Sequence, residues 1–309
     1  MAKSDKRFFY SLVPAALVSS LILVLLFIVL IYYSAPAFKE YGFRIFTTKT
    51  WSPSEESART SEYGLFIPLL GTLVSAIIAV VLALPFAIST VIFTEEVIPK
   101  GMNKVRETFS TLIDVMTGLP TIVYGLWGLA ILAPFLRDNL YNPLYAVLGS
   151  IPLFSCRPVT GTTILTAGIL LSMMIMPFMY SVIRHSYKRI PAIYKEAALA
   201  LGTTKYEYSK IMMGMVKPSI LAGILIGFGR AAGETVAVAL VVGNTFNMPS
   251  CLLSSSYTIS ALIANQFGNA ALYPYMINVL VVGGLILLLI GIVSNILGIM
   301  YLNRVRYTA

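Results

Sequence analysis

The sequence predicts an all-α membrane protein with six transmembrane helices. Hydrophobic residues make up 58% of the 309 residues and charged residues 11%, whereas a soluble domain carries about 25% charged residues. Several uninterrupted apolar runs reach the roughly 20 residues that a helix needs to cross a bilayer. The runs are continuous rather than alternating, and a helix satisfies its own backbone hydrogen bonds in lipid. Membrane-spanning strands are therefore excluded.

The apolar runs that could span the hydrocarbon core recur along the whole chain. They fall at residues 11–33, 66–94, 111–134, 162–184, 218–244 and 275–302. The first run follows the short basic segment KSDKR, is longer than the roughly 7–15 apolar residues of a signal peptide, and has no A-x-A cleavage site. We therefore expect it to be a retained helix.

Lys and Arg are distributed unequally between the two sides of these six helices. Fifteen lie in residues 1–10, 95–110, 184–217 and 303–309, and six lie in residues 34–65, 135–161 and 245–274. Because Lys and Arg concentrate on the cytoplasmic side of membrane proteins, we expect a multi-pass protein of the cytoplasmic (inner) membrane with both termini in the cytoplasm. This asymmetry accounts for the net charge of +9 without nucleic acid as a partner.

The simplest division of the chain is one membrane domain with its connections. The predicted segments are a cytoplasmic N-terminus at 1–10, a first helix at 11–33, an extracytoplasmic loop at 34–65, a helical membrane core at 66–302 with a cytoplasmic loop at 185–217, and a cytoplasmic C-terminus at 303–309. The loop at 34–65 contains Trp51 and the charge run EESARTSE, and it is either a small ordered flap or a solvated connector. The outer loops also hold Cys156 and Cys251, as a disulfide or as two free thiols.

The longest inner loop, HSYKRIPAIYKEAALALGTTKYEYSKIMMGMVKP, is also the most basic. Pro191 can open a helix at its first turn, and residues 192–201 are strong helix formers. Gly202 stands where a left-handed residue would end that helix. The sequence thus predicts a short cytoplasmic helix followed by a turn.

This loop resembles the EAA motif of membrane subunits from ATP-binding-cassette importers, on the residues Glu196, Ala197, Ala198 and Gly202. The resemblance implies that the short helix docks on a separate ATPase subunit; the alternative for Glu196 is a solvated helix charge. The family usually continues to an Ile-x-Leu-Pro ending, whereas this chain has IMMGMVKP. The bend after the docking helix is therefore not predicted by the motif.

Two further stretches narrow the resemblance. LIDVMTGLPTIVYGLWGLAILAP at 112–134 and GFGRAAGETVAVALVVGN at 227–244 resemble helices of the phosphate-specific importer permeases, nearer to the PstC type than to PstA. The resemblance covers roughly residues 8–306 and implies the MetI-like fold. It also implies a PstA-like second permease, two ATPase subunits and an extracytoplasmic phosphate-binding protein, with phosphate moved by alternating access.

The segment at 218–244 carries two charges inside an otherwise apolar run, Arg230 and Glu234. An ionisable residue at the bilayer centre costs at least about 2.5–3.5 kcal/mol, so it normally faces a pathway or a partner. In one helix the two side chains would share a face and could pair. Since an Arg fork binds oxyanions well, our hypothesis is a transient anion site at Arg230 with Glu234 as its exchangeable counter-charge. The alternative is a permanent ion pair.

Glycine and proline mark two places where helices come close or bend. Gly118, Pro120, Gly125 and Gly128 permit a kink or close approach in the third helix, which makes it a candidate gate with Tyr124 and Trp127 as closing side chains or plain packing. Gly229 and Gly233 form a G-x-x-x-G, which with Gly227 is expected to pack against the partner permease.

The chain lacks the features of an enzyme. No G-x-x-x-x-G-K-[ST] occurs in the sequence, so ATP would be bound and hydrolysed on a partner subunit, with no cofactor on this chain. The single histidine, His185, argues against a metal site, and Asp114 is interpreted as favoured by a helix N-terminus. The rival functions are a permease for molybdate, tungstate or sulfate, and an ion-coupled secondary transporter.

Overall fold

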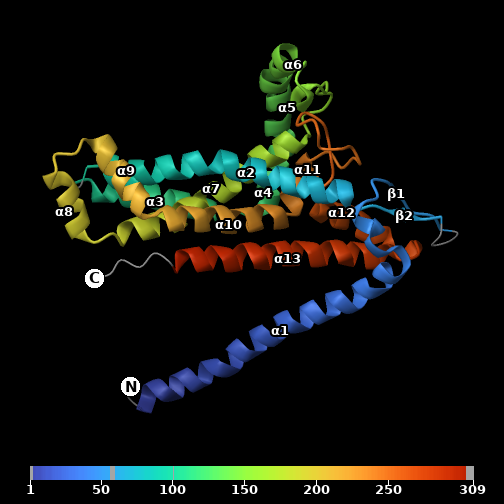
Figure 1. Cartoon of the computed structure of the whole chain (residues 1–309), viewed down its shortest axis with the longest axis horizontal. Coiled ribbons are helices and arrows are strands. Elements are labelled where there is room, and N and C mark those ends of the chain that lie inside the picture. Colours follow the sequence, from blue (N-terminus) through green and yellow to red (C-terminus); the bar gives the residue numbers. More distant parts are fainter. Residues whose placement is uncertain (1–2, 56–59, 100, 304–309) are drawn as a thin grey trace.

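The computed structural model describes residues 3–55, 60–99 and 101–303, and it is built almost entirely of helices (Figure 1). Within these ranges the one sheet is the antiparallel pair β1 (Trp51–Ser52) and β2 (Glu62–Tyr63). The prediction of an all-α membrane protein is confirmed. The predicted C-terminal segment beyond residue 303 and residues 56–59 of the charge run lie outside the described residues.

Four helices are long and apolar enough to cross a membrane. They are α1 (Lys3–Tyr41), α2 (Phe66–Ile92), α7 (Ile164–Lys188) and α13 (Met276–Leu302). In Figure 1 α2, α7 and α13 lie lengthwise in one bundle with α10 (Lys217–Gly233), while α1 meets α13 at one end and diverges from it at the other. The amide of Asn278 donates to the Tyr33 carbonyl at 2.8 Å where the two helices meet.

The two ends of the bundle carry different structures. One end holds α8 (Ala192–Ala200) and α9 (Lys205–Met215), and we call it the α8 end; the other holds β1 and β2 and is called the β1 end (Figure 1). The predicted short helix and turn are confirmed, because α8 stops at Ala200 and Gly202 adopts a left-handed φ of +71°. The other short helical segments are η1 (Gly42–Phe46), η2 (Phe93–Val97), η5 (Pro152–Phe154), α12 (Ile259–Gln266) and η6 (Phe267–Leu272).

Residues 111–134 do not form the single helix that the sequence predicts. Helix α3 (Asn103–Met116) ends early, and after a break the chain turns by 86° into a second helical run over 121–148. That run consists of α4 (Thr121–Trp127), η3 (Gly128–Leu132), α5 (Ala133–Leu136), η4 (Arg137–Tyr141) and α6 (Asn142–Leu148). Pro120 has extended backbone (ψ 132°) just before α4. Proline lacks the N–H that would continue α3 and restricts the residue before it, so the helix stops there.

The predicted helix at 218–244 is also wrong as one element. Helix α10 ends at Gly233, Glu234 is extended (φ −70°, ψ 127°), and a separate α11 runs from Val236 to Val241. Before α10, the chain bends by 64° between α9 and α10. The structure thus has four long spans, or up to six if each bent pair is one span.

The core forms where small residues let helices approach. Ala76, Ala79, Ala83 and Ala87 recur every three or four residues along α2 and are all buried, on a helix packed closely against α7. In membranes such small residues allow the backbone contact that drives helix association. Large apolar side chains such as Val81, Phe86 and Val293 are exposed instead, which suits contact with lipid.

The loop at 34–65 is an ordered flap rather than a solvated connector in its described part. Trp51 stacks on Phe246 with ring centroids 5.9 Å apart, and Tyr63 is 2% exposed. The Tyr63 hydroxyl also donates to the Pro274 carbonyl at 2.8 Å. The flap is therefore fixed to two distant segments of the chain.

Both cysteines are free thiols in this structure. They are nevertheless neighbours, because the Cys156 backbone N–H donates to the Cys251 Sγ at 3.1 Å. The surrounding loops are held together by backbone bonds, such as that from Leu252 N–H to the Leu153 carbonyl at 2.9 Å. Burial and the neighbouring Cys251 thiol raise the pKa of Cys156 to about 11.

Cys156 is predicted to react slowly with alkylating reagents at neutral pH. A raised pKa keeps the thiol protonated, so at pH 8 only about one molecule in a thousand is the reactive thiolate. We expect the alkylation rate, followed by mass spectrometry, to rise about tenfold per pH unit until the pH nears 11. A rate that levels off near pH 9 would show an ordinary thiol.

Gly71→Ala is predicted to destabilise the fold. A Cβ at Gly71 would lie 2.0 Å from the Tyr257 carbonyl oxygen, a backbone atom that cannot move aside as a side chain could. We expect a loss of about 1–3 kcal/mol, as for other overpacked cores, seen as a lower melting temperature of the protein in detergent. The control is Gly291→Ala in α13, where a Cβ meets nothing within 4 Å; equal melting temperatures for the two variants would contradict the packing.

Candidate functional site

Arg230 lies in the last turn of α10, with its side chain exposed on this chain. Its guanidinium carbon is 6.0 Å from the centroid of the Phe178 ring on α7, a cation–π distance. Among the residues that the structure describes, Arg230 forms no ion pair and no side-chain hydrogen bond. Its charge is therefore available to an anion.

Glu234 does not pair with Arg230, contrary to the prediction that both share one helix face. Because α10 has ended at Gly233, the Glu234 side chain turns to the next helix, where its Oε1 accepts from the Ala237 N–H at 3.3 Å. Its carbonyl accepts from the Ser260 hydroxyl at 2.7 Å. Glu234 thus caps α11, as a carboxylate does at a helix N-terminus.

Gly227 and Gly229 of α10 pack inside the chain, and this corrects the expectation that these two face a partner permease. A Cβ at Gly227 would lie 3.3 Å from Met179 of α7, and one at Gly229 would lie 3.1 Å from Ser294 of α13. Gly233 meets nothing within 4 Å. Gly227 and Gly229 therefore hold α10 close to α7 and α13.

The candidate gate residues lie at the break between α3 and α4. Gly118 and Pro120 are in the break itself, and the Tyr124 hydroxyl donates across it to the Met116 carbonyl at 3.1 Å. Trp127, at the end of α4, is 37% exposed. The kink that the glycines and the proline predict is present.

Helix α4 packs on α11, so the two helix breaks are neighbours. A Cβ at Gly125 would lie 2.7 Å from Leu240 and 3.0 Å from Ala237. Ala237 is the residue whose N–H the Glu234 carboxylate accepts. The break at Pro120 and the break at Glu234 are thus joined through α4 and α11.

The docking residues lie on α8 and just after it. Glu196 and Ala197 are exposed, Ala198 is buried, and Gly202 forms the turn. Large apolar side chains around them are also exposed on this chain, among them Ile193, Leu199 and Leu201. Such a surface is suited to covering by another protein.

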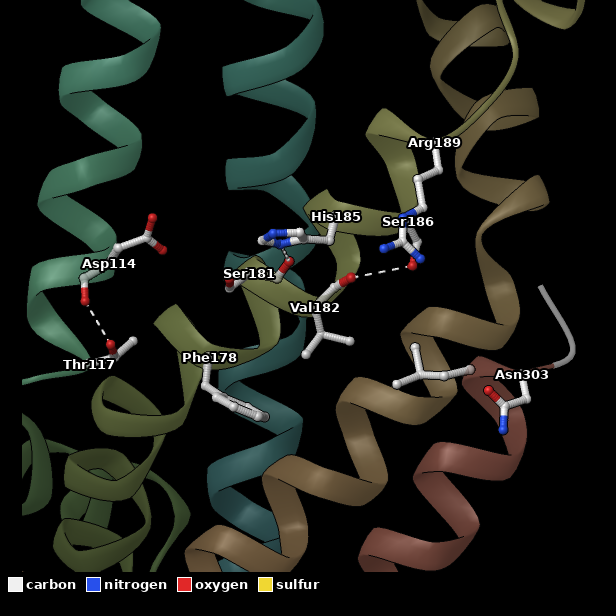
Figure 2. A pocket seen from close by; sticks show the side chains of 10 residues that line it. Asp114, Thr117, Phe178, Ser181, Val182, His185, Ser186, Arg189 and Asn303 are labelled. Carbon is white, nitrogen blue, oxygen red and sulfur yellow. Dashed lines mark hydrogen bonds between the residues drawn. The ribbon is translucent and has the colours of Figure 1, made fainter. Parts of the chain in front are cut away.

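A cavity of about 520 Å³ opens at the α8 end between α3 and α7 (Figure 2). It is lined by charged, polar and apolar side chains, namely Asp114, Thr117, Phe178, Ser181, Val182, His185, Ser186, Arg189, Leu302 and Asn303. Asp114 lies in the last turn of α3, so the interpretation that a helix N-terminus favours its charge is wrong. Another reason must place a carboxylate there.

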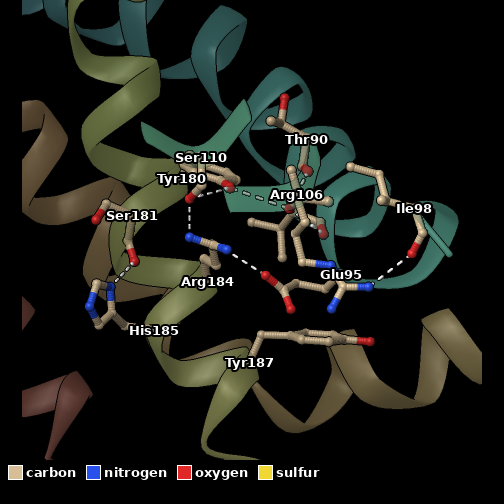
Figure 3. Close-up of polar contacts among 12 residues, drawn as sticks. Thr90, Glu95, Ile98, Arg106, Ser110, Tyr180, Ser181, Arg184, His185 and Tyr187 are labelled. Carbon is tan, nitrogen blue, oxygen red and sulfur yellow. Dashed lines mark hydrogen bonds and ion pairs between the residues drawn. The ribbon is translucent and has the colours of Figure 1, made fainter. Parts of the chain in front are cut away.

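A second polar cluster, which sequence reasoning missed, is buried at the same end (Figure 3). Arg184 of α7 forms an ion pair with Glu95 of η2 at 2.6 Å, with the two side chains 12% and 9% exposed. The Arg184 guanidinium also donates to the Ser110 hydroxyl of α3. The Tyr180 hydroxyl lies 3.3 Å from both Thr94 Oγ1 and Ser110 Oγ.

The same cluster reaches the helix with the docking motif. The Tyr187 hydroxyl donates to Glu96 of η2, and the Lys195 Nζ of α8 lies 5.2 Å from the centroid of the Tyr187 ring. In the sequence, Glu95 and Arg184 look like ordinary loop charges at the ends of apolar runs. The one available signal was a pair of glutamates, TEEV, directly after the second run.

Within the described ranges, no group of three or more His, Cys, Asp and Glu side chains is placed to hold a metal ion.

Comparison with known proteins gives one consistent result. The model of the family described as binding-protein-dependent transport system inner membrane component matches residues 98–307. A protein of Methanocaldococcus jannaschii named probable phosphate transport system permease protein PstC is 46% identical over 95% of this chain and 92% of its own length. Proteins named phosphate transport system permease protein PstC are 36% identical in Pasteurella multocida, over 78% of this chain and 74% of theirs, and 35% identical in Xylella fastidiosa, over 87% and 82%.

Glu95→Gln is predicted to destabilise the protein strongly. It leaves the Arg184 charge buried without a carboxylate, and breaking such a pair costs about 3–5 kcal/mol. The double variant Glu95→Leu, Arg184→Met should recover most of this loss, because it buries no unpaired charge. Melting temperatures of the variants in detergent test both expectations.

The matched control is Asp138→Asn, which breaks the exposed pair formed by Arg137 and Asp138 at 2.8 Å. Exposed pairs contribute little because water screens them, so no measurable change is expected. A drop of equal size in both single variants would contradict the role of burial.

Proposed function

Because the chain belongs to the family of binding-protein-dependent transport system inner membrane components, we propose that it is the permease subunit of an ATP-binding-cassette importer for inorganic phosphate. The observation that supports phosphate as the substrate is the likeness, over nearly the whole chain, to proteins named as PstC permeases. An Arg side chain without a carboxylate partner at membrane depth agrees with an anionic substrate.

Arg230 is proposed as a contact for phosphate in the pathway. Its fork of N–H groups can donate two hydrogen bonds to an oxyanion, and it stays charged at physiological pH. In this conformation the Phe178 ring, rather than a carboxylate, lies against the guanidinium. A cation–π contact is weaker than a buried ion pair, so phosphate would have little to displace.

Glu234 is proposed to act on the gate instead of serving as the counter-charge of Arg230. It caps α11, and α11 packs on α4 next to the break that contains Gly118 and Pro120. A change in this cap would therefore shift α4 and the break. Tyr124 and Trp127 are the side chains proposed to close the path there.

The importer is proposed to need several other subunits. A PstA-like second permease would complete the path, and an extracytoplasmic phosphate-binding protein would deliver the substrate. Two ATPase subunits, one for each permease, would dock on α8 and its counterpart, through Glu196, Ala197, Ala198 and Gly202 here. ATP would be hydrolysed there, since this sequence has no P-loop motif, and the hydrolysis would drive alternating access.

The α8 end is proposed to face the cytoplasm. It carries most of the Lys and Arg residues outside the spans, as the positive-inside tendency requires. The protein would then lie in the cytoplasmic (inner) membrane with both termini inside. Cys156, Cys251 and the flap at the β1 end would face outward, toward the binding protein.

Arg230→Gln is predicted to reduce uptake of radioactive phosphate by cells about tenfold or more. A hydrogen bond to a charged group contributes about 1.5–3 kcal/mol, and 1.4 kcal/mol corresponds to a factor of ten. Arg137→Gln, at an exposed pair, is the control and should transport normally. Copurification of the ATPase subunits shows whether the complex assembles.

Two results would count against this assignment. Near-normal phosphate uptake by an assembled Arg230→Gln complex would remove Arg230 from the path. Uptake blocked by molybdate, tungstate or sulfate more strongly than by unlabelled phosphate would favour another oxyanion as substrate. Transport without any ATPase subunit would favour a secondary transporter.

A further inference from the structure

The cavity at the α8 end is connected to Arg230 through one residue, Phe178. Phe178, which lies beneath the Arg230 guanidinium, also lines the cavity. From Phe178 the wall follows one face of α7 through Ser181 and His185 to Arg189, at intervals of three or four residues (Figure 2). At about 1.5 Å per residue this face is about 16 Å long. Phe178 thus contacts Arg230 on one side and the cavity on the other.

The cavity offers both hydrogen-bond donors and acceptors. Arg189 supplies a guanidinium, which only donates, and Asp114 on the opposite wall supplies a carboxylate, which only accepts when ionised. In the part of the chain that is described, neither side chain forms an ion pair or a hydrogen bond. Both are free to bind a small solute.

His185 adds a second acceptor. Its Nδ1 lies 2.9 Å from the Ser181 carbonyl oxygen, which can only accept, so Nδ1 carries the proton. In the neutral ring the other nitrogen, Nε2, is then an acceptor. The cavity thus combines one strong donor with two acceptors in a volume of about 520 Å³.

A site of this composition selects an anion that carries a proton of its own. Inorganic phosphate keeps a P–O–H group near neutral pH and can donate it to Asp114 or to His185 while its other oxygens accept from Arg189. Sulfate carries no such proton, so it would donate no hydrogen bond to Asp114 or His185, and its oxygens would face the Asp114 charge. A site that accepts a hydrogen bond from its ligand favours that ligand over an analogue that lacks the donor.

We propose that this cavity is an inner binding site for protonated phosphate on the α8 side of Arg230, with Arg189 as donor and Asp114 and His185 as acceptors that exclude sulfate. The proposal rests on the proposed phosphate import and adds a second site at which the oxyanion is selected. It also gives a reason for the carboxylate of Asp114 in a cavity that Arg189 lines as well.

A lipid headgroup is the other source of phosphate chemistry at this depth. A headgroup phosphodiester has no P–O–H near neutral pH and needs only the basic side chains, so Asp114 would oppose it. The two sources are separated by reconstituting the transporter in vesicles of phosphatidylcholine alone or with added phosphatidylglycerol.

The test measures access to the cavity without depending on transport. Thr117→Cys, in the cavity wall, is introduced into the complete transporter together with Cys156→Ser and Cys251→Ser. A small neutral methanethiosulfonate then labels the new thiol in the presence of inorganic phosphate or of sulfate. Thr108→Cys, exposed on the same helix outside this cavity, is the control.

We expect phosphate to slow labelling of the Thr117→Cys variant by a factor of about 1 + [phosphate]/Kd, and sulfate to have no effect. Arg189→Gln should abolish the protection. Asp114→Asn should allow sulfate to protect as well, because the repelling charge is gone. Labelling of Thr108→Cys should not respond to either anion.

Equal protection by phosphate and sulfate in the Thr117→Cys protein would overturn the proposal. So would slower labelling on addition of phosphatidylglycerol alone. An absence of phosphate protection in a complex that still imports phosphate would reject the inner site and leave the proposed function standing. A complex that assembles and imports no phosphate would reject the proposed function.

Discussion

The exclusion of water from the hydrocarbon core is the constraint on which this structure depends. It requires helices, because each helix satisfies its own backbone, and it requires a partner or a cavity for every charge at that depth. Within the spans, Arg230 lies over Phe178, which also lines a cavity, and at the α8 end the partly buried Arg184 meets Glu95. A carboxylate thus lies against the guanidinium of Arg184, and an aromatic ring lies against that of Arg230.

Helices that break inside such a core must be supported by other parts of the protein. The break after α3 is spanned by Tyr124, whose hydroxyl reaches the Met116 carbonyl, and the break after α10 is capped by Glu234. Gly125 brings α4 against α11. The break after α3 and the break after α10 are therefore in contact through α4 and α11, so a movement of one would displace the other.

A contiguous set of contacts leads from α8 to these breaks. Lys195 of α8 lies on the Tyr187 ring, Tyr187 donates to Glu96, and the adjacent Glu95 holds Arg184. Arg184 then donates to Ser110 of α3, the helix that ends at the first break. A displacement of α8 by a docked subunit would therefore reach α3 through charged hydrogen bonds, which are strong and directional.

The length of the apolar runs by itself determined that this chain is a helical membrane protein. Local helix propensity likewise determined the short helix that ends before Gly202. Both properties depend only on residues that are neighbours in the sequence. Most boundaries of the uninterrupted spans followed in the same way. The glycines and Pro120 indicated a kink, but the 86° turn there, the break at Glu234 and the pairing of Glu95 with Arg184 did not follow from the sequence. Arg230 and Glu234 look like a helical pair at a spacing of four, yet the choice of Ala237 as the partner of Glu234 depends on where α11 packs. Only the tertiary structure decides which of several nearby groups a charge meets, since residues far apart in the sequence compete for it.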